Sequence, residues 1–379
     1  MGHSGNARPP VFGKEYVLLW IFGNLSCEGC FFIMQRRKQR VEHKVKDTLL
    51  ILLLVLAPVG FVFTSLFVGR YGVSASEVIY SLTNSLGLTD YNLTTEVQTV
   101  VVYLRAPRSI AAAFVGAGLA VSGAAFQGVF RNPLVNAGLL GVSNGAGFGA
   151  ALAIILFGTQ IAIDSFAFVF GVFAVALSYW IARIYKAVPT VMLILGGTIV
   201  SAVFSALLTM LKFMADVNSQ LPAIVYWLMG SVASVNYGDF WTLIPITLGS
   251  VILLFLGWRI NVISMGDKEA RTMGIDVGIC KIMIIIAATL ATSGAVCIAG
   301  VVGWVGLVIP HIGRMLVGND NRKLLPVAIS LGASFMVLID TVSRSISASE
   351  IPLGVLTALI GAPFFIFLLK KTKGGGWQE

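Results

Sequence analysis

Residues 105–149 read RAPRSIAAAFVGAGLAVSGAAFQGVFRNPLVNAGLLGVSNGAGFG, and this stretch decides the fold. Its segment 109–130 carries no charge over 22 residues, long enough to cross the roughly 30 Å hydrocarbon core of a bilayer. Small residues recur at every fourth position of this segment, at Ala112, Gly116, Ala120, Ala124 and Gly128. This spacing aligns them on one helix face, where a neighbouring helix can approach closely. We therefore predict a membrane-spanning helix that packs inside a bundle.

The same stretch predicts where that helix ends. Pro133 disfavours a helical backbone at Asn132 and donates no backbone hydrogen bond, so the helix should break at Arg131–Leu134. The next apolar run, 138–158, follows at once and opens with the Gly-, Ser- and Asn-rich segment Gly141–Gly149. We expect two helices joined by a tight turn.

The composition of the whole chain indicates a polytopic, all-α membrane protein. Of its 379 residues, 57% are hydrophobic, 11% are charged and 41 are glycine. This charged fraction is about half that of a typical soluble protein. The formal net charge of +9 would suit a nucleic-acid partner, but the basic residues form short clusters between apolar runs. The positive-inside rule explains that pattern better, so no nucleic-acid partner is expected.

Ten membrane-spanning helices are expected, with both termini cytoplasmic. They cover residues 48–68, 109–130, 138–158, 165–182, 190–211, 240–257, 282–302, 303–317, 324–340 and 352–369. The orientation rests on the Lys and Arg cluster between Arg36 and Lys46, which should stay inside. The span 303–317 contains Pro310 and is expected to be short and broken. Outside the membrane, we expect an amphipathic helix at 74–86 and a short helix at 220–229.

The first 47 residues stand apart from this pattern. We treat 1–33 as an extension whose role the sequence does not assign, 34–47 as a basic cytoplasmic segment, and 48–373 as the ten-helix domain. Cys27 and Cys30 form one CxxC pair with no second pair and no nearby His, which is a weak signal for a metal or redox site. Cys280 and Cys297 fall in or beside apolar spans and are interpreted as core residues.

No motif predicts catalysis or an energy source within the chain. The phosphate-binding pattern GxxxxGK[ST] is absent from the sequence. Asp, Glu and Lys are absent from the centres of the expected spans, where proton-coupled carriers place their relays; Asp340 lies near an outer end. His311, in the broken segment, forms no relay by itself. We expect no bound cofactor or metal, and a passage driven from elsewhere, although composition alone leaves a self-sufficient secondary transporter or channel open.

Two cytoplasmic segments could receive energy from a partner. In Asn261–Gly278, Asp267 is a plausible N-cap of a short helix, and Gly274 suits its C-terminal cap. Short helices at a membrane surface can dock into a groove of a partner, although an ordinary solvated loop would have the same pattern. The second segment, Gly318–Pro326, is interpreted as a polar turn.

Four blocks of sequence resemble the permease subunits of ABC importers in the FecCD-type family of iron-chelate, cobalamin and haem uptake. They are LRAPRSIAAAFVGAGLAVSGAAFQGVFRNPLVNAGLLGVSNGAG (Leu104–Gly147), GDKEARTMGIDV (Gly266–Val277), GVVGWVGLVIPHIGRMLVGNDNRKLLP (Gly300–Pro326) and DTVSRSISASEIPLGVLTALIGAPFFIFLLKK (Asp340–Lys371). The similarity runs from about Thr48 to Lys373. It implies an inner-membrane permease dimer with ten helices per subunit, two cytoplasmic ATPases that use ATP, and a periplasmic or lipid-anchored binding protein. The chain itself would not be an enzyme.

The resemblance also implies roles for individual residues. The residues that match the segment seated in the ATPase cleft are Gly266, Asp267, Glu269, Ala270, Arg271 and Gly274. Arg105, Arg108 and Arg344 match arginines that face acidic residues of the binding protein; the alternative is that they reach to lipid headgroups. The commonest cargo of the family is ferric siderophore, with haem and cobalamin as runners-up.

Overall fold

The computed structural model describes residues 52–183, 190–347 and 349–371, and every regular element among them is a helix. The extension 1–33, the segment 34–47 and the Cys27/Cys30 pair lie outside these residues. The chain divides into the units Met1–Leu53 and Leu54–Glu379, and the helices from Ala75 onward belong to the second. The expected all-α fold class is confirmed for the described residues.

The helices follow one another with short connections. After an apolar helix at Leu52–Ser65 come α2 (Ala75–Ser85), α3 (Thr95–Gln98), a π-helical segment (Thr99–Arg105), α4 (Ala106–Phe130), a 3₁₀ turn (Ala137–Leu140), α5 (Val142–Leu156), α6 (Gln160–Arg183), α7 (Thr190–Met214), α8 (Gln220–Met229), a 3₁₀ turn (Tyr237–Thr242), α9 (Leu243–Met265), α10 (Asp267–Thr272), α11 (Val277–Ala299), α12 (Val305–Val317), α13 (Asn321–Ile346) and α14 (Leu353–Lys371). The two short helices expected at 74–86 and 220–229 correspond to α2 and α8.

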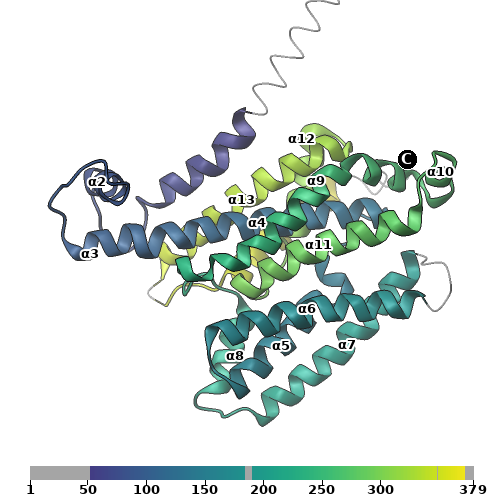
Figure 1. The fold of residues 1–379 in the computed structure, drawn as a ribbon, viewed down its shortest axis with the longest axis horizontal. Coiled ribbons are helices and arrows are strands. Elements are labelled where there is room, and N and C mark those ends of the chain that lie inside the picture. Colours follow the sequence, from purple (N-terminus) through teal and green to yellow (C-terminus); the bar gives the residue numbers. More distant parts are fainter. Residues whose placement is uncertain (1–51, 184–189, 348, 372–379) are drawn as a thin grey trace, which may run out of the picture. The chain divides into compact units, whose positions relative to one another are not determined.

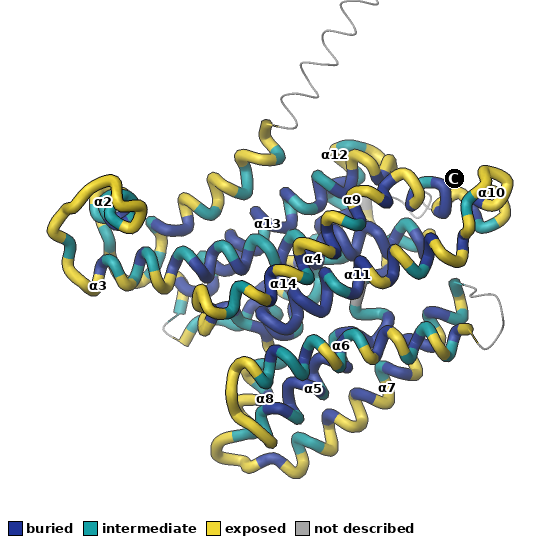
Figure 2. The backbone as a smooth tube through the Cα atoms, in the orientation of Figure 1, coloured by how far each residue is buried: buried dark blue, intermediate teal, exposed yellow. Residues whose placement is uncertain are grey.

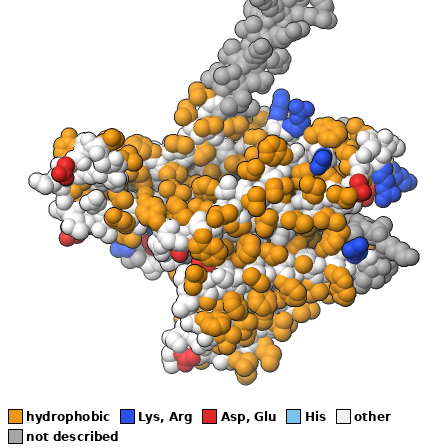
Figure 3. All heavy atoms as spheres, in the orientation of Figure 1, with side chains coloured by type: hydrophobic (Ala, Val, Ile, Leu, Met, Phe, Trp, Pro, Cys, Tyr) orange, Lys and Arg blue, Asp and Glu red, His pale blue; other side chains and the backbone are white. Residues whose placement is uncertain are grey.

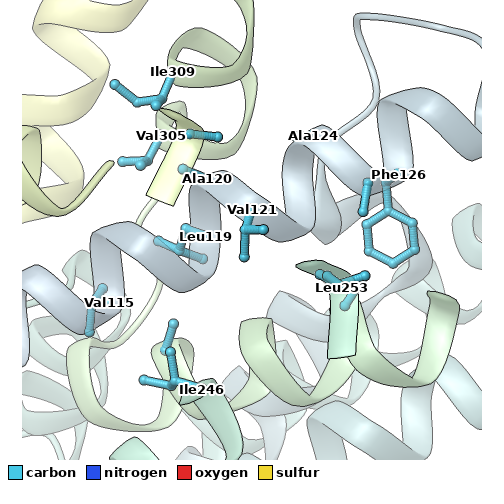
Figure 4. Packing of buried hydrophobic residues seen from close by; sticks show 14 of the residues in the cluster. Val115, Leu119, Ala120, Val121, Ala124, Phe126, Ile246, Leu253, Val305 and Ile309 are labelled. Atoms are coloured by element: carbon cyan, nitrogen blue, oxygen red, sulfur yellow. The ribbon is translucent and has the colours of Figure 1, made fainter. Parts of the chain in front are cut away.

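Helix α4 is the centre of the unit. It packs against α9, α11, α12 and α13, and most of its residues are buried (Figure 2). Figure 4 shows Ile246 and Leu253 of α9 below it, and Val305 and Ile309 of α12 above it. Because neighbours surround α4, its low content of polar side chains reflects burial in protein.

The remaining helices form a second group beside this one. Figure 1 shows α5, α6, α7 and α8 packed together, with α6 alongside α11. Short α10 lies at one end of the unit, and α2 and α3 lie at the other (Figure 1). We call these the α10 end and the α2 end.

Glycines set the closest approaches to α4. A Cβ atom added at Gly116 would collide with the carbonyl oxygen of Gly332 in α13, and one added at Gly332 would collide with the carbonyl oxygen of Gly116. Gly123, outside the every-fourth-residue series, meets Gly306 of α12 in the same way. Of the series itself, Ala112, Gly116, Ala120 and Ala124 are buried, whereas Gly128 is half-buried against Ile260 and Asn321. Small side chains therefore occur on more than one face of α4.

The break after α4 lies where Pro133 predicts it. Arg131 adopts a left-handed conformation with φ 51° and ends the helix, and Asn132 donates its backbone N–H to Gln127 O over 3.2 Å. A 3₁₀ turn then leads into α5, whose 15 residues make it shorter than the expected span 138–158.

Pro310 does not break α12, contrary to the expectation for 303–317. A proline in a helix leaves the carbonyl four residues earlier without its usual donor, here Gly306 O. Gln127 of α4 donates its Nε2 to that oxygen over 3.3 Å, so the helix continues through Val317. The irregular backbone lies just before α12, where Gly300 has φ 67° and Trp304 has φ 68°. A neighbouring side chain thus makes proline acceptable here.

The expected count of ten spans and the cytoplasmic termini stay predictions. Six helical segments of the described residues are long and apolar enough to cross a membrane: Thr95–Phe130, Gln160–Arg183, Thr190–Met214, Tyr237–Met265, Val277–Ala299 and Asn321–Ile346. Apolar helices of 10–17 residues occur at Leu52–Ser65, Val142–Leu156, Gln220–Met229, Val305–Val317 and Leu353–Phe367. A stretch of that length falls short of a bilayer unless the flanking residues contribute.

Candidate functional site

Three arginines gather at the α2 end. Arg105, Arg108 and Arg344 come from the π-helical segment, α4 and α13, and they are 4%, 7% and 6% exposed. The sequence expectation that they face a partner must therefore be refined, because each guanidinium already has acceptors within this chain.

Arg105 binds backbone carbonyl groups. Its two terminal nitrogens donate to Leu66 O over 2.8 Å and to Tyr71 O over 2.6 Å. A Cβ atom added at Gly69 would lie 2.6 Å from its Nη2 atom, so a larger residue there would require the guanidinium to shift. Arg105 thus holds the segment that follows the helix Leu52–Ser65 against the start of α4.

Arg108 and Arg344 share a buried carboxylate, Asp340. Arg108 Nε lies 2.7 Å from Asp340 Oδ1, and its Nη1 lies 2.9 Å from Glu350 Oε1. Arg344 Nε is 3.8 Å from Asp340 Oδ2, and its Nη2 donates to Ser65 O. Asp340 is fully buried, whereas the Glu350 side chain is 30% exposed. We call these four residues the arginine cluster; it joins α4, α13 and the segment before α14.

The arginine cluster includes two residues that sequence reasoning did not select. Asp340 lies four residues before Arg344, a spacing that places both on one helix face and could have suggested the pair. Glu350 carried no signal, because its contact with Arg108 spans 242 residues of sequence. Its backbone has φ 49°, an uncommon conformation for a residue with a side chain.

The α10 end carries the segment expected to dock on an ATPase. Gly266, with φ 143°, precedes α10 and is its N-cap residue, so the expectation that Asp267 caps the helix is wrong. Asp267 instead pairs with Lys281 of α11, with Nζ and Oδ2 2.7 Å apart. Gly274 has φ 78° and follows the end of α10, as a C-terminal cap glycine does.

The exposed face of α10 differs from the set that the resemblance implied. Lys268, Glu269 and Arg271 are exposed and could meet a partner. Ala270 is fully buried against Val262 and Val277 of this chain, so its side chain cannot reach a partner surface. Ala270 fixes α10 to the bundle, and its exposed neighbours form the candidate contact surface.

The second segment that was expected to be cytoplasmic, Gly318–Pro326, lies beside the first. Gly318–Asp320 connect α12 to α13, but the turn expected over Gly318–Pro326 is shorter than predicted, because Asp320 caps α13 and Asn321–Pro326 form its first turns. Asn261 of α9 donates Nδ2 to Asp320 Oδ1 over 2.6 Å and accepts from the Asn321 backbone N–H over 2.7 Å. The hydrogen bond from Asn261 lowers the pKa of the Asp320 carboxyl. These contacts join the two segments into one surface at the α10 end.

A cavity of about 440 Å³ opens near the α2 end, between α8, the start of α6 and the end of α11. Its polar lining includes Gln160, Gln220 and Tyr226, and none of the described residues that line it is charged. Behind Gln160, the buried Asp164 accepts a 2.8 Å hydrogen bond from Gln160 Nε2. Sequence reasoning missed Asp164 because it began this span at residue 165, whereas α6 begins at Gln160.

Comparison with known proteins finds a family model and relatives that match most of this chain. A family model described as the FecCD transport family matches residues 52–371. The molybdate import system permease of Haemophilus influenzae is 41% identical over 334 residues, 87% of this chain and 96% of that protein. A probable iron chelatin transport system permease of Helicobacter pylori is 37% identical over 73% of this chain and 83% of that protein.

Two further matches are a permease named for cobalamin import and a solved structure. The cobalamin import system permease of Halobacterium salinarum is 39% identical over 72% of this chain and 74% of its own length. A solved structure, described as the inward-facing conformation of an ABC transporter provisionally assigned to the metal-chelate type, matches with a TM-score of 0.76 and 40% identity. That match covers 86% of this chain and 99% of the solved chain.

Proposed function

Because this chain belongs to the FecCD transport family and is an ABC importer permease, we propose that it forms half of a translocation pathway for a metal chelate, namely a ferric siderophore. The observation that carries the proposal is the family match over residues 52–371. The iron chelatin permease and the metal-chelate type transporter among its relatives support this cargo class. The protein acts in the inner membrane, where a second permease copy or a related subunit completes the pathway.

A second cargo, molybdate, is favoured by a specific observation. The molybdate permease has 41% identity to this chain and matches over 96% of its own length. A small oxyanion and a bulky chelate differ greatly in size, so a competition experiment separates them. The family also includes cobalamin permeases, which makes cobalamin the third cargo to test.

Two partners follow from the two ends of the unit. We propose that the α10 end is cytoplasmic and that the exposed Lys268, Glu269 and Arg271 contact an ATPase. The binding protein docks at the α2 end, over the arginine cluster. Arg108 holds Glu350, which is partly exposed, so a partner carboxylate at the surface would compete with Glu350 for one guanidinium.

Transport by a reconstituted system tests the cargo. Proteoliposomes would contain this chain and its ATPase, with ATP inside and the cognate binding protein outside. We expect ATP-dependent uptake of radiolabelled ferric siderophore, with molybdate and cobalamin as alternatives in parallel samples. Uptake that persists without the ATPase would instead support a self-sufficient transporter and overturn the proposal.

Crosslinking tests the partners and the orientation together. Cysteines placed at Tyr71, which is 48% exposed at the α2 end, and at Lys268 are compared in a background in which Cys27 and Cys30 are serine. We expect Tyr71→Cys to capture the binding protein and Lys268→Cys to capture the ATPase. Labelling of Lys268→Cys by an impermeant reagent added to intact cells would show that the α10 end lies outside and that the proposed orientation is wrong.

A further inference from the structure

A groove runs between α6 and α11 on the surface of the unit. It encloses about 360 Å³, and its walls are almost entirely apolar. Val172, Val175 and Ala176 come from α6, and Ile282, Ile285 and Ile286 come from α11. Several of these side chains are open to the surroundings; Ile286, for example, is 54% exposed. Figure 3 shows how densely hydrophobic side chains cover one face of the unit.

The groove is about as long as one leaflet of a bilayer is thick. Its lining on α6 extends from Val172 to Arg183, which are 11 residues apart. At 1.5 Å per residue this is about 16 Å, and half of the roughly 30 Å hydrocarbon core is about 15 Å. An acyl chain of a single leaflet therefore matches the groove along its whole length.

The two ends of the groove differ in chemistry. At the α10 end, Arg183 is exposed and forms no hydrogen bond or ion pair with another described residue. Tyr179 and Trp180 lie within one turn of it, and Trp180 is 67% exposed. Aromatic side chains with a polar edge favour the headgroup level of a membrane. The groove thus ends in a cation and an aromatic pair where a lipid headgroup would lie.

The nearest basic residue of α11 does not share this role. Lys281 precedes the lining residue Ile282, but its side chain is 3% exposed and pairs with Asp267 at 2.7 Å. Among the described residues that line the groove, Arg183 is therefore the cation available to an anion. A second protein chain in the groove would have to supply a carboxylate to Arg183 or leave it unpaired, whereas a phospholipid supplies both the apolar chain and the phosphate.

We propose that the groove between α6 and α11 binds an anionic phospholipid, with one acyl chain between the helices and the phosphate at Arg183. The lipid belongs to the leaflet at the α10 end. The identification of that leaflet as the cytoplasmic one rests on the orientation proposed above, whereas the lipid site itself does not. Anionic lipids are common in the cytoplasmic leaflet, and a nearby Lys or Arg strengthens their attraction about fivefold per residue.

The test measures lipid binding to the purified full-length chain by native mass spectrometry. The delipidated protein is titrated with phosphatidylglycerol and with phosphatidylcholine of the same acyl chains. Arg183→Gln should weaken the binding of phosphatidylglycerol about fivefold and leave the binding of phosphatidylcholine unchanged. Ala176→Phe should fill the groove and weaken the binding of both lipids.

Matched variants control for charge and for bulk. Arg322→Gln removes an exposed arginine of α13, and Val169→Phe enlarges an exposed residue of α6 outside the groove. Neither should change the binding of either lipid. Equal phosphatidylglycerol binding by the wild type, Arg183→Gln and Ala176→Phe would overturn the proposal.

Two other outcomes separate this proposal from its alternatives. If Ala176→Phe disrupts a permease dimer while lipid binding is unchanged, the groove is covered by a second chain and the proposal is wrong. If both groove variants lose lipid as expected but the wild-type chain shows no ATP-dependent uptake, the lipid site stands and the proposed transport function fails.

Discussion

Replacing Asp340 with alanine should destabilise the α2 end more than replacing a carboxylate on the surface. Asp340 is fully buried and accepts from Arg108 at 2.7 Å, with Arg344 3.8 Å away. The variant leaves two guanidinium groups whose side chains are 9% and 6% exposed, and breaking a buried pair typically costs about 3–5 kcal/mol. Glu350 remains 2.9 Å from Arg108 and limits the loss, so we expect a value near 3 kcal/mol, the lower end of this range.

The assay is unfolding of the detergent-solubilised full-length chain, followed by tryptophan fluorescence during titration with a denaturing detergent. Asp90→Ala is the matched control, because Asp90 is exposed and surface substitutions usually change stability by less than about 0.5 kcal/mol. Asp340→Asn keeps the shape of the side chain and should lose less stability than Asp340→Ala. If Asp340→Ala unfolds at the same point as Asp90→Ala, the arginine cluster does not stabilise the fold, and a docking role for its arginines gains support.

Three further outcomes follow from other contacts. Gly116→Ala should destabilise the chain by about 1–3 kcal/mol because the new Cβ meets a backbone carbonyl of α13. Gly60→Ala should not destabilise the chain, because the space around Gly60 is open; the same unfolding titration compares the two variants. Arg271→Glu should lower ATPase-coupled uptake without changing the unfolding midpoint, since Arg271 is exposed; normal uptake would exclude α10 as the coupling element. The pKa of the Asp320 carboxyl is lowered, so its contribution to stability is present above the ordinary Asp value of 3.8 and is lost as pH falls through the lowered value. Asn261→Ala should raise this pKa, which infrared titration of the carboxylate measures. An unchanged pKa would contradict the hydrogen bond from Asn261 as its cause.

Local signals predicted much of the helical order. The uncharged run at 109–130, the proline after it and the glycine that follows α10 depend on neighbouring residues, so they can be read directly from the chain, whereas the N-cap assigned to Asp267 was wrong. The structure accordingly has α4 ending at Phe130, and α8 at Gln220–Met229. The outcome for Pro310 could not be predicted, because the donor that replaces the lost backbone hydrogen bond is Gln127, 179 residues from Gly306.

The contacts of the candidate site residues were not predicted, and their docking role stays a prediction. Sequence similarity selected Arg105, Arg108 and Arg344, yet it could not reveal that their acceptors lie within the same chain. The orientation of Ala270 depends on how a six-residue helix packs onto α9 and α11, which no short sequence pattern determines. Burial distinguishes residues that shape a docking segment from residues that touch the partner.

The sequence separation within the arginine cluster bears on how the protein is made. Arg108 and Asp340 are 232 residues apart, and synthesis at about 5–20 residues per second delays the carboxylate by about 10–50 s. During that interval Arg108 is in or near the membrane without its buried partner, and α4 lacks the glycine face of α13. The early helices must therefore wait in contact with lipid or with the insertion machinery. A chain that ends before Asp340 would have Arg108 without its buried carboxylate and a central helix without the glycine face of α13.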